Sequence, residues 1–466
     1  MIRIDVLPDD VLLEIFDFYM VLSISYEYLE DESAFEAWQQ LVHVCRRWRC
    51  LVFGSPRRLD LRLRCTYERS TKSTLDVWPA LPLVIDASVG VDEDLEVVPG
   101  MDNVVAALEQ SNRVCQVKLH VGPGLAEELG EILAAMQVPF PELTQFELAD
   151  GMEGLDDLMP VIPDSFLGGS APRLQSFQLF GFSFPGLPNL LLSATHLVEL
   201  CLYSIPHSGY ISPEAIAAAL SVLSNLEILQ ISFPLTESRP VSESPSLSIP
   251  KRSILPALSG LAFQGVTGYL EQLVIRIDTP RLHGMDIRLF NQIGTPRLAQ
   301  FINRTSLGAG DKAYVDFHDD QFSAKVKTFE ILNSCSEPDQ QLSSIAQFYN
   351  PLRSLSTVER LDISCQCHRR VWKNDAIQNT LWLQLLLPFT AVKEFRLSRA
   401  LVPSIAATLN ELVGSRIIEV LPSLQNILVD RPEQSGALKE TFGHFVAARQ
   451  LYDRPVRVSI SGFNCV

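Results

Sequence analysis

The chain has few basic residues relative to its acidic ones. Its 466 residues include 38 Lys and Arg against 55 Asp and Glu, which gives a formal net charge of −17 at pH 7. Proteins that bind nucleic acid need a basic surface, because binding neutralises phosphates. The charge balance therefore argues against nucleic acid as the main partner.

The chain also lacks long apolar runs and a secretory pattern at its start. No run approaches the ~18 apolar residues that a membrane-spanning helix requires. The first five residues, MIRID, are not a basic segment followed by an apolar one. Nine cysteines, an odd number, lie scattered without paired spacing, which favours a reducing compartment. We expect a soluble protein of the cytoplasm or nucleus.

Motifs that mark catalytic sites are missing as well. The sequence contains no glycine-rich phosphate loop, no G-x-S-x-G turn and no H-E-x-x-H zinc motif. Cys365-Gln366-Cys367-His368 holds metal-binding residue types, but no second cysteine pair is evident, and we interpret Cys365 as a buried strand end. His318-Asp319-Asp320 has acid–base groups in a polar stretch, where a solvated loop is the alternative. We expect no catalytic site, no metal and no cofactor.

The first 55 residues hold two helical patterns. In the first, Pro8 suits the first helical position, and Asp9 and Asp10 place negative charge at the positive end of the helix dipole. The apolar residues that follow at three- and four-residue spacing predict one stripe, made of Leu12, Ile15, Phe16 and Tyr19.

The second pattern begins with Ser33 and Glu36, which have the spacing of a capping box. Gly54 before Ser55-Pro56 predicts the end of this helix. Its apolar residues at helical spacing are Trp38, Leu41, Val42, Cys45, Trp48 and Val52. About 55 residues are marginal for an independent core, so part of the apolar surface of the two helices needs a partner.

These residues resemble a known family. The string L-P-x-x-V-L-L-x-I-F from Leu7 to Phe16, followed by V-C-R-R-W-R from Val44 to Arg49, is similar to an F-box, especially that of the F-box proteins numerous in mushroom-forming fungi. The resemblance implies a helical module that docks on a SKP-type adaptor and, through it, on a cullin–RING ubiquitin ligase. The alternative is a helical hairpin packed on its own domain. The residues that match adaptor-binding positions are Leu7, Pro8, Leu12, Ile15, Phe16, Val44, Cys45 and Trp48.

Two local features qualify this module. F-box helices are joined by a short linker, whereas here an acidic insert intervenes between Ser23 and Glu32. A cluster of arginines with one acidic residue, Asp60, follows the module, and we interpret it as a solvated or adaptor-facing rim. These arginines are Arg46, Arg47, Arg49, Arg57, Arg58, Arg62 and Arg64.

From residue 101 onward a short apolar pattern recurs, mostly every 23 to 34 residues. Its form is apolar-x-x-apolar-x-apolar, and repetition at a similar period indicates a repeat protein. The first residues of its predicted strands are Val114, Leu143, Leu174, Leu197, Leu226, Leu258, Leu270, Leu282, Val326, Val358, Val392 and Leu424.

Amphipathic helices precede several of these strands. Ser212-Pro213-Glu214 caps one, and others centre on Leu108 and on Ile377-Leu381-Leu385. Strand, crossover helix and strand form the unit of a parallel sheet. We therefore expect an α/β fold: a helical module, then an irregular α/β solenoid with a parallel sheet, which resembles the leucine-rich-repeat class of F-box receptors. The Asn that usually follows the strand in that repeat is absent from most units, and an open doubly wound α/β domain is the alternative.

The predicted organisation has three parts: a helical module at 1–55, linking strands and an acidic loop at 56–100, and the solenoid at 101–466. In the linking part, Leu59, Leu61 and Leu63 alternate as in a strand, and the acidic loop covers Asp86 to Gly100. Residues 236–256 and 303–323 interrupt the repeat. A helix containing Phe442 and a strand at 455–460 complete the C-terminal cap.

Together these features predict a substrate receptor of an SCF-type ubiquitin ligase, without chemistry of its own. Two alternatives are an adaptor-bound scaffold without ubiquitin transfer, and a divergent hydrolase that uses His318 and Asp320. The acidic composition favours a substrate with a basic segment. Asp92, Glu93, Asp94 and Glu96 are candidates to contact that segment, although solubility explains them equally well.

Overall fold

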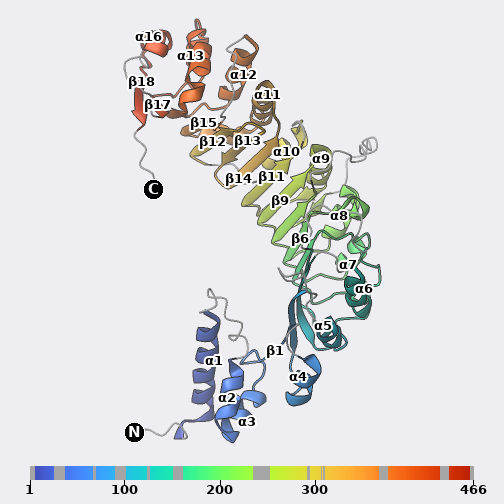
Figure 1. The fold of residues 1–466 in the computed structure, drawn as a ribbon. Helices are drawn as coiled ribbons and strands as arrows, with labels where there is room; N and C mark the ends of the chain where they lie inside the picture. Colours follow the sequence, from blue (N-terminus) through green and yellow to red (C-terminus); the bar gives the residue numbers. More distant parts are fainter. Residues whose placement is uncertain are drawn as a thin grey trace, which may run out of the picture. The chain divides into compact units, whose positions relative to one another are not determined.

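The computed structural model describes residues 6–25, 37–66, 70–89, 101–122, 126–150, 161–234, 252–290, 294–305, 307, 310–366, 376–430 and 440–461. The chain forms two compact units (Figure 1). The first comprises Met1–Glu199 with Ile205–Tyr210, and the second comprises Leu200–Ser204 with Ile211–Val466. Strand β6 (Glu199–Tyr203) is divided between them.

The described part of the N-terminal region contains three helices, α1 (Asp9–Ser25), α2 (Trp38–Val44) and α3 (Arg46–Gly54). The single helix predicted for the second pattern is wrong, because Cys45 has an extended backbone (φ −160°, ψ 167°) and separates α2 from α3. The Cys45 Sγ accepts a hydrogen bond from the backbone N–H of Trp48 at 3.5 Å, so Cys45 caps α3 instead of continuing α2. The end at Gly54 is confirmed, and the predicted capping box of Ser33 and Glu36 lies outside the described residues.

The sheet of the first unit is parallel. Strands β1 (Leu63–Cys65), β2 (Leu83–Val89), β3 (Val114–Val121), β4 (Gln145–Asp150) and β5 (Ser176–Phe180) are neighbours in chain order. Side chains on one face of these strands are buried beneath the helices. One core row runs in register across four strands through Ile85, Val117, Phe146 and Phe177, each at most 2% exposed.

The linking region differs from the expectation in two places. Leu59 and Leu61 are buried but lie before β1, so the predicted strand begins only at Leu63. Asp86 belongs to β2 and not to the predicted acidic loop, of which the remainder from residue 90 lies outside the described residues. Four helices border this sheet: α4 (Thr71–Val77), α5 (Met101–Leu108), α6 (Ala126–Ala135) and α7 (Leu187–Leu191).

The sheet of the second unit is mostly parallel but contains an antiparallel insertion. Its strand order is β7-β9-β11-β14-β13-β12-β15-β16-β17-β18. These strands are β7 (Ile228–Ser232), β9 (Gly260–Gly265), β11 (Gly284–Leu289), β12 (Lys312–Phe317), β13 (Gln321–Val326), β14 (Phe329–Ser334), β15 (Arg360–Cys365), β16 (Glu394–Leu397), β17 (Asn426–Asp430) and β18 (Arg457–Ser461).

The antiparallel strand is β13, which runs against both β12 and β14. The predicted parallel sheet is therefore wrong in this segment, and the interruption predicted at 303–323 contains β12. Antiparallel neighbours need only short turns, and here β13 and β14 are joined by Lys327 and Thr328, with Lys327 in the left-handed region at φ 54°. These strands alternate buried and more exposed residues as the repeat strands do, so alternation alone does not distinguish the antiparallel segment.

The repeat prediction is confirmed at most positions. Apart from the pattern that begins at Leu270, the last two apolar residues of each predicted unit lie in a strand. The Leu270 pattern instead lies mainly in helix α9 (Thr267–Val274), because Leu270, Leu273 and Val274 also share one helical face and are fully buried there. Val326 ends β13, and its unit continues across a turn into β14.

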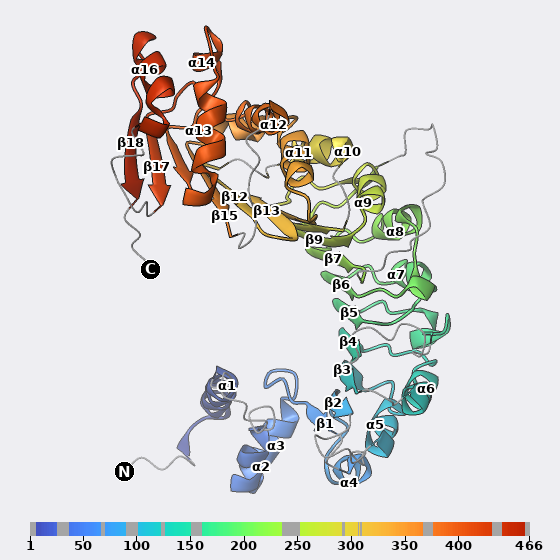
Figure 2. The same ribbon diagram turned by 45° about the horizontal axis from the view of Figure 1, so that its top comes forward.

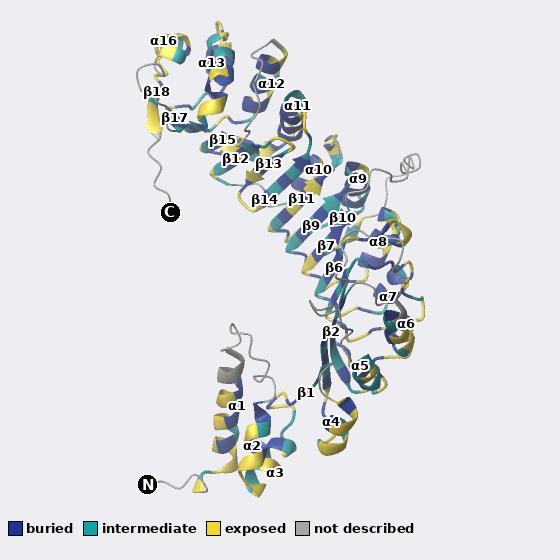
Figure 3. Cartoon of the chain, in the orientation of Figure 1, coloured by how far each residue is buried: buried dark blue, intermediate teal, exposed yellow. Residues whose placement is uncertain are grey.

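Apart from α1–α3, the helices lie along one side of the strands in each unit (Figure 2). Buried residues alternate with more exposed ones along the strands (Figure 3). The predicted cap of α8 (Pro213–Leu220) is confirmed, since the Ser212 side chain accepts from the Ala215 N–H at 3.2 Å. In α12 (Ala376–Leu386) the predicted face is partly wrong, because Trp382 is buried and Ile377 is 66% exposed. The other helices are α10 (Pro296–Ile302), α11 (Pro338–Tyr349), α13 (Val402–Asn410), α14 (Arg416–Glu419) and α16 (Gly443–Leu451).

The remaining described elements are short. Strands β8 (Ser253–Ile254) and β10 (Ile277–Asp278) form a separate parallel pair. The 3-10 helices are η3 (Phe166–Gly169), η4 (His207–Gly209), η5 (Arg353–Thr357) and η6 (Arg399–Leu401). The predicted final helix and strand correspond to α16 and β18.

Neighbouring residues of β7 provide a test of the strand register. Leu229 is fully buried, as predicted together with Leu200 and Leu361, whereas Ile228 is 43% exposed. We expect Leu229→Ala to lower the free energy of unfolding by about 3 kcal/mol, and Ile228→Ala by less than about 1 kcal/mol. Urea denaturation of both variants measures the difference. Equal losses would contradict the assignment of Leu229 to the core.

A buried carboxylate caps a helix in the second unit. Glu271 of α9 is 8% exposed and accepts hydrogen bonds from the backbone N–H groups of Arg297 and Leu298, at 3.1 and 2.7 Å. These two N–H groups follow Pro296 in the first turn of α10, where no intrahelical acceptor is available. Burial raises the pKa of the Glu271 carboxyl above its ordinary value, and the two N–H groups oppose that rise.

This raised pKa predicts a pH-dependent stability. The folded state binds the Glu271 proton more tightly than the unfolded state, so stability decreases as pH rises from the ordinary pKa through the raised one. Glu271→Gln removes the titration. We expect the wild type to lose stability relative to this variant across that window, as measured by urea denaturation at a series of pH values. A stability difference that is constant with pH would contradict the prediction.

Candidate docking site

Helix α1 has two apolar faces, of which one is buried and the other is partly exposed. Leu12, Phe16 and Met20 recur at four-residue spacing and are at most 7% exposed. A second set of apolar residues occupies the adjoining face at positions i, i+4, i+7 and i+8. These are Val11, Ile15, Phe18 and Tyr19, which are exposed by 38, 42, 66 and 38%. At about 100° per residue, the two sets together cover roughly 200° of the helix, about twice a one-sided stripe.

The packed face of α1 is fixed by aromatic contacts. The Phe16 ring lies 4.7 Å from the Trp48 ring of α3, centroid to centroid. In α2, Trp38 is fully buried, contacts the Trp78 ring at 5.0 Å, and donates its Nε1–H to the Arg62 carbonyl at 3.1 Å. The helices are therefore anchored to the segment that leads into β1. A rigid support of this kind holds the second apolar face of α1 in place.

Ion pairs fix the start of α1 and the chain after α3. The Arg47 Nη2 donates to the Leu7 carbonyl at 2.6 Å and to the Asp9 carboxylate at 2.5 Å. Arg58 pairs with Glu14, and Arg62 pairs with Asp60 at 2.8 Å. Much of the arginine cluster, interpreted from the sequence as a solvated rim, is thus engaged in intramolecular pairs. Arg46, Arg49 and Arg57 are exposed.

The structure separates the eight predicted adaptor-binding residues into groups. Leu12 and Phe16 are fully buried and hold the helices together. Leu7 and Trp48 are partly buried. The exposed members are Pro8, Ile15, Val44 and Cys45.

Three details of that prediction change. The predicted stripe is split, with Ile15 and Tyr19 on the exposed face. Cys45, interpreted from the sequence as a packing residue, is exposed because the helix is interrupted there. Pro8 precedes the helix and its carbonyl accepts from the Leu12 N–H at 3.1 Å. The predicted set omits Val11 and Phe18, although both lie at helical spacing from Ile15 in the sequence.

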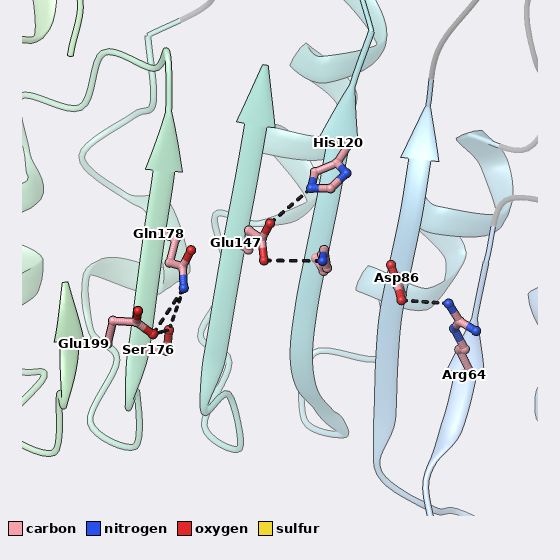
Figure 4. Close-up of polar contacts among 8 residues, drawn as sticks. Arg64, Asp86, His120, Glu147, Ser176, Gln178 and Glu199 are labelled. Atoms are coloured by element: carbon pink, nitrogen blue, oxygen red, sulfur yellow. Dashed lines mark hydrogen bonds and ion pairs between the residues drawn. The ribbon is translucent and has the colours of Figure 1, made fainter. Parts of the chain in front are cut away.

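A second surface is the sheet face opposite the helices. In the first unit a row of polar residues runs in register through Asp86, Lys118, Glu147 and Gln178. Asp86 pairs with Arg64 at 2.8 Å, and Glu147 lies 3.1 Å from His120 and 3.8 Å from Lys118 (Figure 4). At the far side, the Glu199 carboxylate accepts from Ser176 at 2.9 Å and from Gln178 at 3.2 Å. Opposite charges on adjacent strands stabilise this face and leave it nearly balanced in charge.

The corresponding face of the second unit is likewise mixed. Glu394 accepts from Arg360 at 2.7 Å and from Arg396 at 2.9 Å. Burial alone would raise the pKa of Glu394, but these two guanidinium groups hold it below its ordinary value. Burial raises the pKa of the neighbouring Asp362, whose carboxylate lies 4.0 Å from the Arg396 Nε.

The residues considered for chemistry are engaged in local contacts. The His318 Nε2 lies 3.2 Å from the Asp316 carboxylate, which also accepts from Ser364 at 2.7 Å. The Cys365 N–H donates to the Ser398 Oγ at 3.1 Å, and Cys367 and His368 lie outside the described residues. Within the described part of the chain, no group of three or more His, Cys, Asp or Glu is placed to hold a metal ion. Among these same residues, no helix is both long and apolar enough to cross a membrane.

Comparison with known proteins gives a likeness in structure but none in sequence. No protein-family model matches the chain, and no curated protein matches it by sequence. A solved structure that it resembles is the leucine-rich repeat-containing protein LegL7 from Legionella pneumophila, at 11% sequence identity and a TM-score of 0.27. The match covers 82% of this chain and 97% of that one. The functional proposal below rests on the residues of this chain.

Proposed function

We propose that the chain is a substrate receptor of an SCF-type ubiquitin ligase. The N-terminal helices dock on a SKP-type adaptor as an F-box does, and the strand–helix repeats, which are leucine-rich-repeat-like, bind a protein substrate. Ubiquitin transfer is carried out by other subunits, and the receptor contributes by holding the substrate close to them. The protein acts in the cytoplasm or nucleus, where this machinery operates.

The exposed apolar face of α1 carries this proposal. Val11, Ile15 and Phe18 are large apolar residues that form one face on a helix whose other apolar face is already packed. Contiguous apolar surface of this kind marks an interaction site. The face lies within the L-P-x-x-V-L-L-x-I-F string from Leu7 to Phe16 and just beyond it, so the resemblance and the exposed surface coincide in the chain.

The repeat units supply the second part of the proposal. Their open sheet face presents donors, acceptors and both signs of charge in rows, as on Asp86, Lys118 and Glu147. A protein segment with complementary charges can bind such a face, and charge complementarity contributes more to specificity than to affinity. The basic substrate segment expected from the net charge of −17 stays a prediction, to be tested by the salt dependence of association.

Affinity capture of the tagged full-length chain, with the proteasome blocked, tests the proposal. Co-purification of both a SKP-type adaptor and a cullin is expected. Capture of the adaptor without the cullin would indicate the scaffold alternative. Capture of neither would contradict the docking role of the N-terminal helices.

A further inference from the structure

Strand β18 presents a hydrogen-bonding edge. It is the last strand in the order of its sheet, and within the described residues it is hydrogen-bonded to another strand only along its β17 side. The Arg457 N–H donates to the Gln425 carbonyl at 2.8 Å, and Arg457 is in parallel register with Asn426. In a parallel ladder alternate residues bond to the same neighbour. Arg457, Ser459 and Ser461 therefore face β17, and the N–H and C=O groups of Val458 and Ile460 point to the outer edge.

The same two residues carry partly exposed apolar side chains. Val458 and Ile460 are in register with Ile427 and Val429, both fully buried, so they lie on the core side of the sheet. Ile460 is nevertheless 44% exposed, because the core ends beside it. The terminal strand of a repeat array needs a polar cap or a partner. Here the strand combines outward backbone groups with uncovered apolar side chains.

We propose that β18 pairs antiparallel with β18 of a second copy of this chain, around a twofold axis at Ser459. In that register Val458 lies opposite Ile460 of the second copy, and the reverse pair forms by symmetry. Both are residues whose N–H and C=O groups point outward, so each pair exchanges two backbone hydrogen bonds. Their side chains meet on the core side and cover each other. One self-complementary edge is all that a twofold dimer requires.

Charges on the opposite side of the sheet fit the same register. Arg457 of the second copy lies opposite Ser461, which is in register with Asp430 on β17. The arginine Cα is then about 10 Å from that of Asp430, with only the small Ser461 between them. This distance is within reach of a salt bridge between long and short side chains. The two Arg457 residues do not face each other, so no like charges are opposed.

Sedimentation of the full-length chain over a concentration series tests the dimer. The wild type is expected to dimerise, and Ile460→Pro is expected to raise the dimer dissociation constant at least tenfold. Proline removes an N–H that β17 does not use, and edge strands tolerate proline at such positions. Ser459→Ala changes no outward backbone group and is expected to keep the dimer. A monomeric wild type at all concentrations, or a dimer that persists in Ile460→Pro, would overturn the proposal.

Disulfide trapping tests the register without relying on the proline variant. The two Ser459 residues form a non-hydrogen-bonded antiparallel pair with Cα atoms about 4.5 Å apart, inside the range for a disulfide. Ser459→Cys is expected to form a covalent dimer on mild oxidation. Arg457→Cys is the matched control, because its two copies lie about 13 Å apart. This register would be ruled out if neither variant formed more covalent dimer than the wild type. It would also be ruled out if both variants formed the same amount.

Discussion

Arg449→Met is expected to lower the free energy of unfolding by about 5 kcal/mol. Arg449 of α16 is completely buried, and burial lowers the pKa of its guanidinium. It donates to the carbonyl oxygens of Ile417 at 3.1 Å and of Leu421, Pro422 and Leu424 at 3.3 to 3.4 Å. These carbonyls precede β17, so one side chain fixes the path of the chain beneath the last helix.

The loss follows from the acceptors that remain. Methionine fills a similar volume but donates nothing, and each buried carbonyl without a donor costs about 1–3 kcal/mol. Arg454→Met is the control, since Arg454 is exposed and follows the same helix. Urea denaturation of both variants measures the effect. A loss in Arg449→Met no greater than in Arg454→Met would show that water satisfies the carbonyls in the variant.

The repeat architecture was predictable because its signal is periodic. Leu229, Leu261 and Phe395 each recur within the same short pattern, and all lie in the core of a strand. The Leu270 pattern failed because Leu270 and Leu273, three residues apart, also share one face of a helix. The antiparallel β12–β14 segment was not predicted for a different reason: its strands alternate buried and exposed residues as the repeat strands do, and short turns leave no separate loop signal between them.

Which residues of α1 are exposed was not predictable from the sequence alone. Leu12 and Ile15 are similar in size and apolarity, and they lie three positions apart on one helix, so spacing alone could not tell the packed face from the exposed one. The partner that decides it, Trp48, contacts Phe16, and its position depends on the break between α2 and α3 at Cys45. The role of Arg449 was likewise not predictable from the sequence, because a buried arginine is rare and its acceptors are backbone carbonyls.

Substitutions on the two faces of α1 are expected to affect different properties, adaptor binding for Ile15 and stability for Leu12. Ile15→Asp places a charge on the exposed face, where it remains solvated in the free protein but is buried when a partner binds. Burying an unpaired carboxylate in an apolar interface costs several kcal/mol. We therefore expect Ile15→Asp to weaken binding of a SKP-type adaptor by at least roughly a hundredfold, with the unfolding free energy of the receptor almost unchanged.

Leu12→Ala is expected to lower stability and to leave adaptor binding unchanged. Leu12 is fully buried against the neighbouring helices, so its truncation is expected to cost about 2–4 kcal/mol of stability, while adaptor binding by the folded fraction is retained. Asp10→Ala, at an exposed position at the start of the helix, controls for a general effect of changing α1. Isothermal titration with purified adaptor and urea denaturation of each variant measure the two quantities separately. If Ile15→Asp bound the adaptor as tightly as Asp10→Ala does, the exposed face of α1 would not be the docking surface.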